Sequence, residues 1–132
     1  MSSRTITTRA LAAAVGTATA AAVLVSAPSS QAAPRANNVV TIKAEGTDLS
    51  GTVKSKRKAC KDERKVFLVK QKGAKGGTDD KVIASDTTEL QNGVGQWSTG
   101  NTGIESRFYA KIKRTALCKG ATSPTVRAIR EE

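Results

Sequence analysis

Apolar and polar residues alternate along several short stretches of this chain, which is the pattern of β-strands with one buried face. The longest example covers residues 106–114. There Phe108, Ala110 and Ile112 are expected to face a core, whereas the residues between them, Tyr109 included, are expected to face outward. This alternation predicts a strand in the late part of the chain.

Leu49, Gly51 and Val53 alternate with polar residues in the same way, and residues 65–72 form the most hydrophobic stretch, which we expect to be a central strand. Turn-forming residues separate these stretches, and no helical periodicity is evident after the first 32 residues. Seven strands are predicted in all, over residues 39–45, 49–54, 65–72, 81–86, 96–99, 106–114 and 122–130. This arrangement is typical of an all-β, seven-stranded Greek-key β-sandwich.

The first 32 residues differ in composition from the rest of the chain. Arg4 and Arg9 precede an apolar stretch rich in Ala and Val, and small residues stand before a candidate cleavage site after Ala32. This order is typical of a secretory signal peptide. The apolar stretch is shorter than the ~20 residues of a membrane-spanning helix. We therefore expect residues 1–32 to be removed and the mature protein to be secreted, soluble and without a transmembrane anchor.

The remaining chain has the length of one small domain. Residues 33–38 are predicted to be a disordered lead-in, and residues 39–130 to form the β-sandwich domain. The chain contains two cysteines, Cys60 and Cys118. Cysteines of an exported protein usually pair, so a disulfide bond is predicted here, with two free thiols as the alternative. Such a bond would tie the early part of the domain to its late part.

Several segments together resemble the transthyretin-like (prealbumin-like) sandwich of secreted bacterial modules. They are Ser50-Gly51-Thr52-Val53, Val66-Phe67-Leu68, Ser85-Asp86, Gly95-Gln96-Trp97 and Phe108-Tyr109-Ala110-Lys111-Ile112. The resemblance covers nearly the whole predicted domain and rests on core and turn positions. It implies a β-sandwich fold and an extracellular interaction or scaffold role, and it carries over no functional residues.

The chain contains no histidine, which excludes Ser-His-Asp and Cys-His catalysis as well as histidine zinc sites. Four carboxylates lie close together in the sequence, and we interpret them as solvated turn residues rather than as a calcium or catalytic cluster: Asp79, Asp80, Asp86 and Glu89. We therefore expect no enzyme activity, no cofactor and no metal. Trp97 is expected in the core, with a ligand platform as the alternative.

The chain is strongly basic. Its formal net charge is +11, which falls to +9 when the leader containing Arg4 and Arg9 is removed. The predicted disulfide would bring two basic stretches to one end of the domain, and their side chains are the candidate polyanion-binding residues: Lys54, Lys56, Arg57, Lys58, Lys61, Lys111, Lys113, Arg114 and Lys119. A basic surface of this kind favours polyanions, although it can also serve only to keep a protein soluble.

No specific nucleic acid partner is expected, because the pattern contains no helix for a groove, and Tyr109 is the one aromatic residue that we place among these lysines. The sequence predicts a monomeric, non-enzymatic binding or scaffolding protein of the cell envelope. Its partner would be an anionic polymer or an extracellular protein. The alternative is a small secreted protease inhibitor that acts through an exposed loop, either residues 73–80 or residues 92–95.

Overall fold

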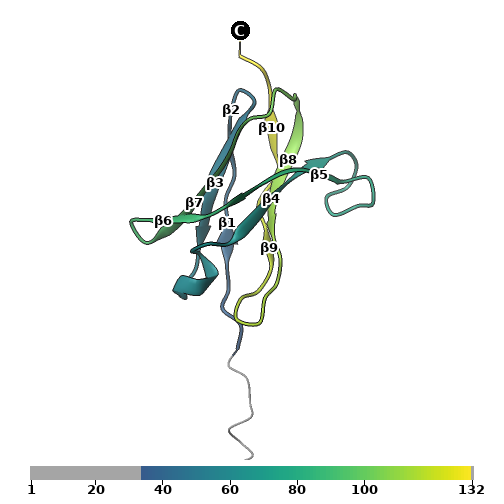
Figure 1. Ribbon diagram of the computed structural model, residues 1–132. Coiled ribbons are helices and arrows are strands. Elements are labelled where there is room, and N and C mark those ends of the chain that lie inside the picture. Colours follow the sequence, from purple (N-terminus) through teal and green to yellow (C-terminus); the bar gives the residue numbers. More distant parts are fainter. Residues whose placement is uncertain (1–33, 132) are drawn as a thin grey trace, which may run out of the picture. The chain divides into compact units, whose positions relative to one another are not determined.

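A computed structural model describes residues 34–131 as an all-β unit (Figure 1). In this part of the chain, ten strands form two antiparallel sheets, and one short 3-10 turn, η3 (Lys58–Cys60), lies in the connection between β3 and β4. No helix within these residues is long and apolar enough to cross a membrane. The predicted signal peptide lies outside the described residues, so it stays a prediction.

The first sheet has the order β1-β3-β7-β6, and β2 extends the edge formed by β1 because both strands pair with β3. The bounds of its strands are β1 (Val39–Val40), β2 (Lys43–Glu45), β3 (Asp48–Lys54), β6 (Glu89–Gln91) and β7 (Val94–Asn101). Strands β3 and β7 form its centre.

The second sheet has the order β10-β8-β4-β5, and β9 also pairs with β8. The bounds of its strands are β4 (Lys65–Gln71), β5 (Lys81–Thr87), β8 (Ser106–Ile112), β9 (Ala121–Thr122) and β10 (Val126–Ala128). The prediction that residues 65–72 form a central strand is confirmed, since β4 lies between β8 and β5.

Two of the predicted strands are each split into a pair. The first, residues 39–45, is divided at Thr41, whose carbonyl oxygen lies against Gly51. A Cβ atom at Gly51 would lie 2.0 Å from that oxygen. The last is divided at Ser123, whose Oγ accepts a hydrogen bond from the Ala110 N–H at 2.8 Å. In both places the strand stops pairing with its neighbour, β3 or β8, and pairs with the same neighbour again a few residues later.

One strand, β6, lies where the sequence predicted a loop. A two-residue turn at Asn92 and Gly93 joins it to β7, and both residues have positive φ angles, 52° and 79°. Asn-Gly is the favoured pair for such hairpin turns, because both positions require left-handed backbone. The Asn-Gly signal was present in the sequence, but the short flanking segment β6 was not recognised as a strand.

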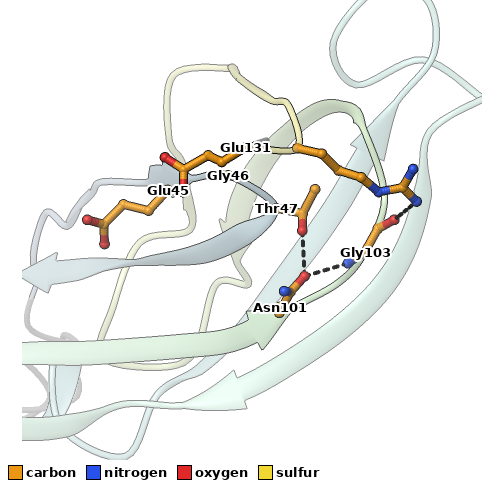
Figure 2. A pocket seen from close by; sticks show the side chains of 7 residues that line it. Glu45, Gly46, Thr47, Asn101, Gly103 and Glu131 are labelled. Atoms are coloured by element: carbon orange, nitrogen blue, oxygen red, sulfur yellow. Dashed lines mark hydrogen bonds between the residues drawn. The ribbon is translucent and has the colours of Figure 1, made fainter.

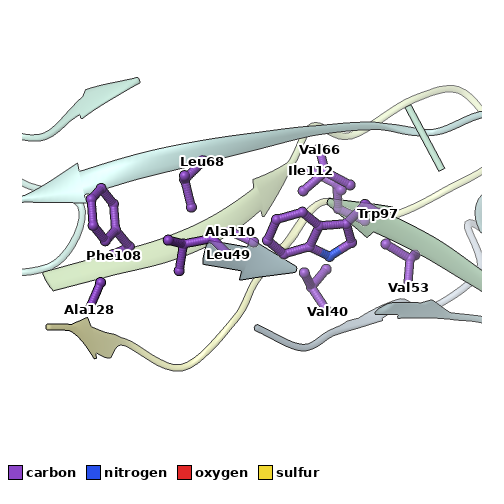
Figure 3. Packing of buried hydrophobic residues seen from close by; sticks show 10 residues of the cluster. All are labelled: Val40, Leu49, Val53, Val66, Leu68, Trp97, Phe108, Ala110, Ile112 and Ala128. Atoms are coloured by element: carbon purple, nitrogen blue, oxygen red, sulfur yellow. The ribbon is translucent and has the colours of Figure 1, made fainter. Parts of the chain in front are cut away.

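The inner faces of the two sheets form the core, which Figure 3 shows from close by. Phe108, Ala110 and Ile112 are buried as predicted, and Trp97 is only 3% exposed, which confirms its place in the core. The buried cluster consists of Val40, Leu49, Val53, Val66, Leu68, Trp97, Phe108, Ala110, Ile112 and Ala128. The alternation of apolar residues in the sequence therefore identified the inner face correctly.

Tyr109 faces outward from β8, as predicted, but it is not on the surface. It is only 3% exposed, because the loop before β5 folds back over it. The Tyr109 hydroxyl donates a hydrogen bond to Asp80 Oδ2 at 2.6 Å, and the Nζ of Lys75 lies 5.1 Å from the centre of the tyrosine ring. Arg107 adds hydrogen bonds to the carbonyls at the start of this loop. Residues 73–80 thus form a loop that is exposed, as expected, and that is anchored to the second sheet through Lys75 and Asp80.

Candidate functional site

The predicted disulfide bond is present between Cys60 and Cys118, whose Cα atoms are 5.5 Å apart. Cys60 ends the η3 turn between β3 and β4, and Cys118 lies in the connection between β8 and β9. The bond therefore joins the two sheets at one end of the sandwich. We call this end, with residues 35–38, 54–61 and 111–119, the disulfide end.

Two arginines hold the disulfide end together. Arg57 donates a hydrogen bond from Nη1 to the Leu117 carbonyl at 2.6 Å. Arg64 is buried, and its guanidinium donates to the carbonyls of Cys60 at 3.1 Å and Lys113 at 2.7 Å. Burial lowers the pKa of the Arg64 guanidinium. These contacts give both arginines a structural role, which for Arg57 comes in addition to its place in the predicted basic set.

The segment before β1 is ordered, which differs from the predicted disordered lead-in. Ala36 forms a parallel bridge with Cys118: its N–H donates to the Leu117 carbonyl and its own carbonyl accepts from the Lys119 N–H, both at 2.9 Å. Arg35 Nε donates to the Thr115 carbonyl at 2.8 Å. Nothing in the local sequence predicts this pairing, because its partner lies about 80 residues away.

The nine predicted basic residues do not form one continuous face. Val53 and Ile112 point into the shared core from opposite sheets, so their neighbours Lys54 and Lys111 point outward on opposite sides. The residues near the bond itself, among them Arg57 and Lys119, are gathered at the disulfide end. The disulfide thus brings the two basic stretches to the same end, but it does not place all their side chains together.

A basic groove lies on the side of β1. It has a volume of about 540 Å³, and Arg35, Lys54 and Lys56 line it together with Val39, which is 58% exposed. No acidic residue is among its lining residues. Arg35 was missed in the sequence analysis because its segment was expected to be disordered.

On the outer face of the second sheet, lysines surround an aromatic ring. Phe67 on β4 is half-buried, and the Nζ atoms of Lys65 and Lys113 lie 5.6 Å and 5.0 Å from its ring centre. Lys111 is directly opposite Phe67 in the strand register. The aromatic residue among the lysines is therefore Phe67, whereas Tyr109 is buried under the loop. Alternation along β4 could have identified Phe67, since both of its neighbours face the core.

The basic residues of the disulfide end keep their charge unpaired. Among residues 34–131 the one ion pair joins Lys43 and Glu45, at 3.6 Å, and both side chains are exposed. None of the nine predicted cations forms such a pair within the described part. Unpaired cations raise the electrostatic potential around this end, which attracts anions.

The four carboxylates near the loop do not converge on a metal site, and no group of three or more candidate ligands occurs in the described residues. Asp80 accepts hydrogen bonds from Tyr109 and from the Gly76 N–H, and Asp86 Oδ2 accepts from the Ser98 N–H at 2.8 Å. Two of the four carboxylates thus have structural roles, in contrast to the predicted solvated turn.

The contact between Tyr109 and Asp80 predicts a pH dependence. The hydrogen bond from Tyr109 lowers the pKa of Asp80. Burial, and then the hydrogen bond to Asp80, raise the pKa of Tyr109 above its ordinary value. The stabilisation is therefore present between the ordinary pKa values of the two groups. It is lost as the pH falls through the lowered pKa of Asp80 or rises through the raised pKa of Tyr109.

Because the chain contains one tyrosine, its phenolate absorbance can be titrated directly. We expect ionisation above the usual pH, and D80N should move it back towards the ordinary value because the charge near the phenol is gone. A titration of the wild type at the ordinary pKa would contradict the docked loop. D79N, which changes an exposed neighbour, is the control and should leave the titration unchanged.

A second pocket, of about 310 Å³, lies away from the disulfide end (Figure 2). The carboxylates of Glu45 and Glu131 line it, but its other polar groups bond to one another: Asn101 Oδ1 accepts from the Gly103 N–H at 2.8 Å, and Arg130 donates to the Gly103 carbonyl at 2.9 Å. These hydrogen bonds account for the other polar groups that line the pocket, so the pocket gives no sign of a ligand.

Comparison of the chain with protein-family models and with curated proteins finds no significant match.

Proposed function

We propose that this protein is a secreted, non-enzymatic β-sandwich that binds an anionic polymer of the cell envelope through its disulfide end. The observation that carries the proposal is the set of unpaired cations at this end, with a groove whose lining contains Arg35, Lys54 and Lys56 and no carboxylate. Secretion is supported by the leader-like N-terminus and by the disulfide bond, which persists in oxidising compartments.

The binding would be electrostatic and therefore sensitive to salt. A polyanion holds condensed counterions, and each cation that engages it releases some of them. Lysines on flexible stems suit a polymer with repeated, evenly spaced charges better than one rigid ligand. The groove and the lysines around Phe67 offer two such surfaces on opposite sheets.

We also infer a Greek-key sandwich. The connections β3–β4, β5–β6 and β7–β8 each pass from one sheet to the other, which is the connectivity of immunoglobulin-type sandwiches. Sandwiches of this kind serve many unrelated functions, so the fold alone supports no activity. The transthyretin-like resemblance stays a prediction about the family.

Retention on immobilised heparin and on teichoic acid tests the proposed function. We expect the wild type to bind and to elute with increasing salt. The double variant K54E/K56E should bind about thirtyfold more weakly or worse, because each of the two lysines near an anionic surface contributes roughly 1 kcal/mol. K111E/K113E tests the opposite face in the same way.

K72E/K81E is the matched control, since it changes the net charge equally with two exposed lysines outside the disulfide end. If all three double variants lose retention alike, net charge alone explains the binding and the site is wrong. Binding that changes neither with the salt concentration nor with charge reversal would contradict the electrostatic mechanism.

The protease-inhibitor alternative also stays a prediction. Of its two loops, residues 73–80 are docked through Asp80 on the second sheet, and the turn at Asn92 and Gly93 has only two residues. Residues 73–79 are exposed, but no observation on either loop favours this function. Inhibition assays against serine and metalloproteases decide it.

A further inference from the structure

The loop between β8 and β9 carries an apolar side chain at its tip. The Thr115 N–H donates to the Cys118 carbonyl at 2.9 Å, and the Cys118 N–H donates to Thr115 Oγ1 at 3.1 Å. These bonds close a hairpin whose tip is Ala116 and Leu117. Both tip residues are exposed, and Leu117 is 50% exposed.

This tip is held in place from several sides. The Leu117 carbonyl accepts hydrogen bonds from the Ala36 N–H at 2.9 Å and from Arg57 Nη1 at 2.6 Å. The next residue, Cys118, is buried and covalently bound to Cys60. The exposed leucine therefore belongs to a pre-organised loop, so a contact through it requires little further ordering.

The surroundings of Leu117 are basic. No acidic residue occurs between Glu105 and Glu131 in the sequence. Two arginines from other segments bond to the carbonyls of this hairpin, and three cations flank it in the sequence: Lys113, Arg114 and Lys119. An apolar side chain at the disulfide end is thus placed among cations.

We propose that the disulfide end docks on an anionic lipid surface, with Leu117 inserted between the headgroups. The inference rests on the proposed function, because the same cations supply the attraction, and it adds a lipid surface as the partner. The groove that contains Arg35, Lys54 and exposed Val39 lies at the same end and offers cations to a lipid phosphate.

The size of the tip favours a bilayer over other partners. A stable protein interface buries about 800 Å² on each partner, far more than one leucine and one alanine provide. A dissolved polyanion would engage the cations but has no apolar interior for Leu117. A bilayer with anionic headgroups provides both negative charge and an apolar layer beneath it.

Co-sedimentation with vesicles tests the inference. We expect the wild type to bind vesicles of phosphatidylglycerol mixed with phosphatidylcholine and to leave pure phosphatidylcholine vesicles unbound. L117S should lower the partition coefficient about tenfold, because a buried leucine side chain is replaced by a polar one. I129S is the matched control, since Ile129 is 56% exposed and follows β10, away from the disulfide end, and it should bind like the wild type.

A second variant reports insertion directly. Trp97 is the one native tryptophan and is buried, so its emission should not respond to lipid. In L117W, the introduced side chain should shift its emission to the blue on anionic vesicles and be quenched by brominated lipids. The unchanged emission of Trp97 in the wild type also shows that the fold persists on the membrane.

The outcomes separate this inference from the proposed function. Retention of L117S on heparin together with loss of vesicle binding supports both. If L117S and the wild type bind vesicles equally, or if neither binds them while both bind heparin, the lipid inference is wrong and the proposed function stands. Failure of the wild type to bind heparin, teichoic acid and vesicles overturns both.

Discussion

Removal of the Cys60–Cys118 bond by the double variant C60A/C118A is expected to lower the free energy of unfolding by about 4 kcal/mol. The bond closes a loop of 58 positions, and the closure entropy that it removes from the unfolded chain corresponds to roughly this amount. Small domains are stable by about 5–15 kcal/mol, so this is a large share of the total. Urea unfolding followed by Trp97 fluorescence measures it.

The same urea titration shows whether the disulfide bond stabilises the protein mainly by restricting the unfolded chain. If the bond acts mainly on the unfolded chain, the variant should show a larger m-value, because its unfolded state exposes more surface. Hydrogen exchange should also become faster at the Ala36 and Lys119 amides, whose bonds depend on the position of Cys118. Equal midpoints for the variant and the wild type would contradict the role assigned to the disulfide.

Substitution G51A is expected to be similarly severe, with a loss of about 3 kcal/mol or more. A Cβ atom at Gly51 would lie 2.0 Å from the Thr41 carbonyl oxygen and 2.8 Å from Cζ2 of Trp97. Backbone and a buried indole leave little room to adjust. To make room for the methyl group, β3 would have to move away from β1 and β2. Urea unfolding measures the resulting loss in the free energy of unfolding.

G73A is the matched control, because a Cβ atom there would meet nothing within 4 Å. It should leave stability unchanged or raise it slightly, since alanine restricts the unfolded chain. The emission of Trp97 should shift in G51A and remain unchanged in G73A, because the indole is the side chain that the new methyl group approaches. Equal stability of the two variants would show that the close approach at Gly51 is not rigid.

The sequence predicted the parts of this fold that depend on local pattern. Alternation identified the core face of β8 through Phe108, Ala110 and Ile112, and that of β3 through Leu49 and Val53. Such patterns are local because side chains in a strand point to opposite faces with a period of two. The same rule would have placed Phe67 among the lysines.

The features that the sequence did not predict are contacts between distant segments. The lead-in is ordered because Ala36 bonds to Leu117 and Lys119, and the loop before β5 is docked because Asp80 reaches Tyr109. Neither partner can be recognised from the local residues, since each has an ordinary loop or surface composition. The division of two predicted strands likewise depends on what lies opposite them.

The sequence by itself determined the all-β class, the paired cysteines and the excess of positive charge, because periodicity, cysteine number and composition are properties of the chain alone. The tertiary structure alone decided where the charges lie. It placed Lys54 and Lys111 on opposite faces, added Arg35 to the groove and fixed Leu117 among cations. The physical reason is that a surface is assembled from segments that meet only after the sheets have packed.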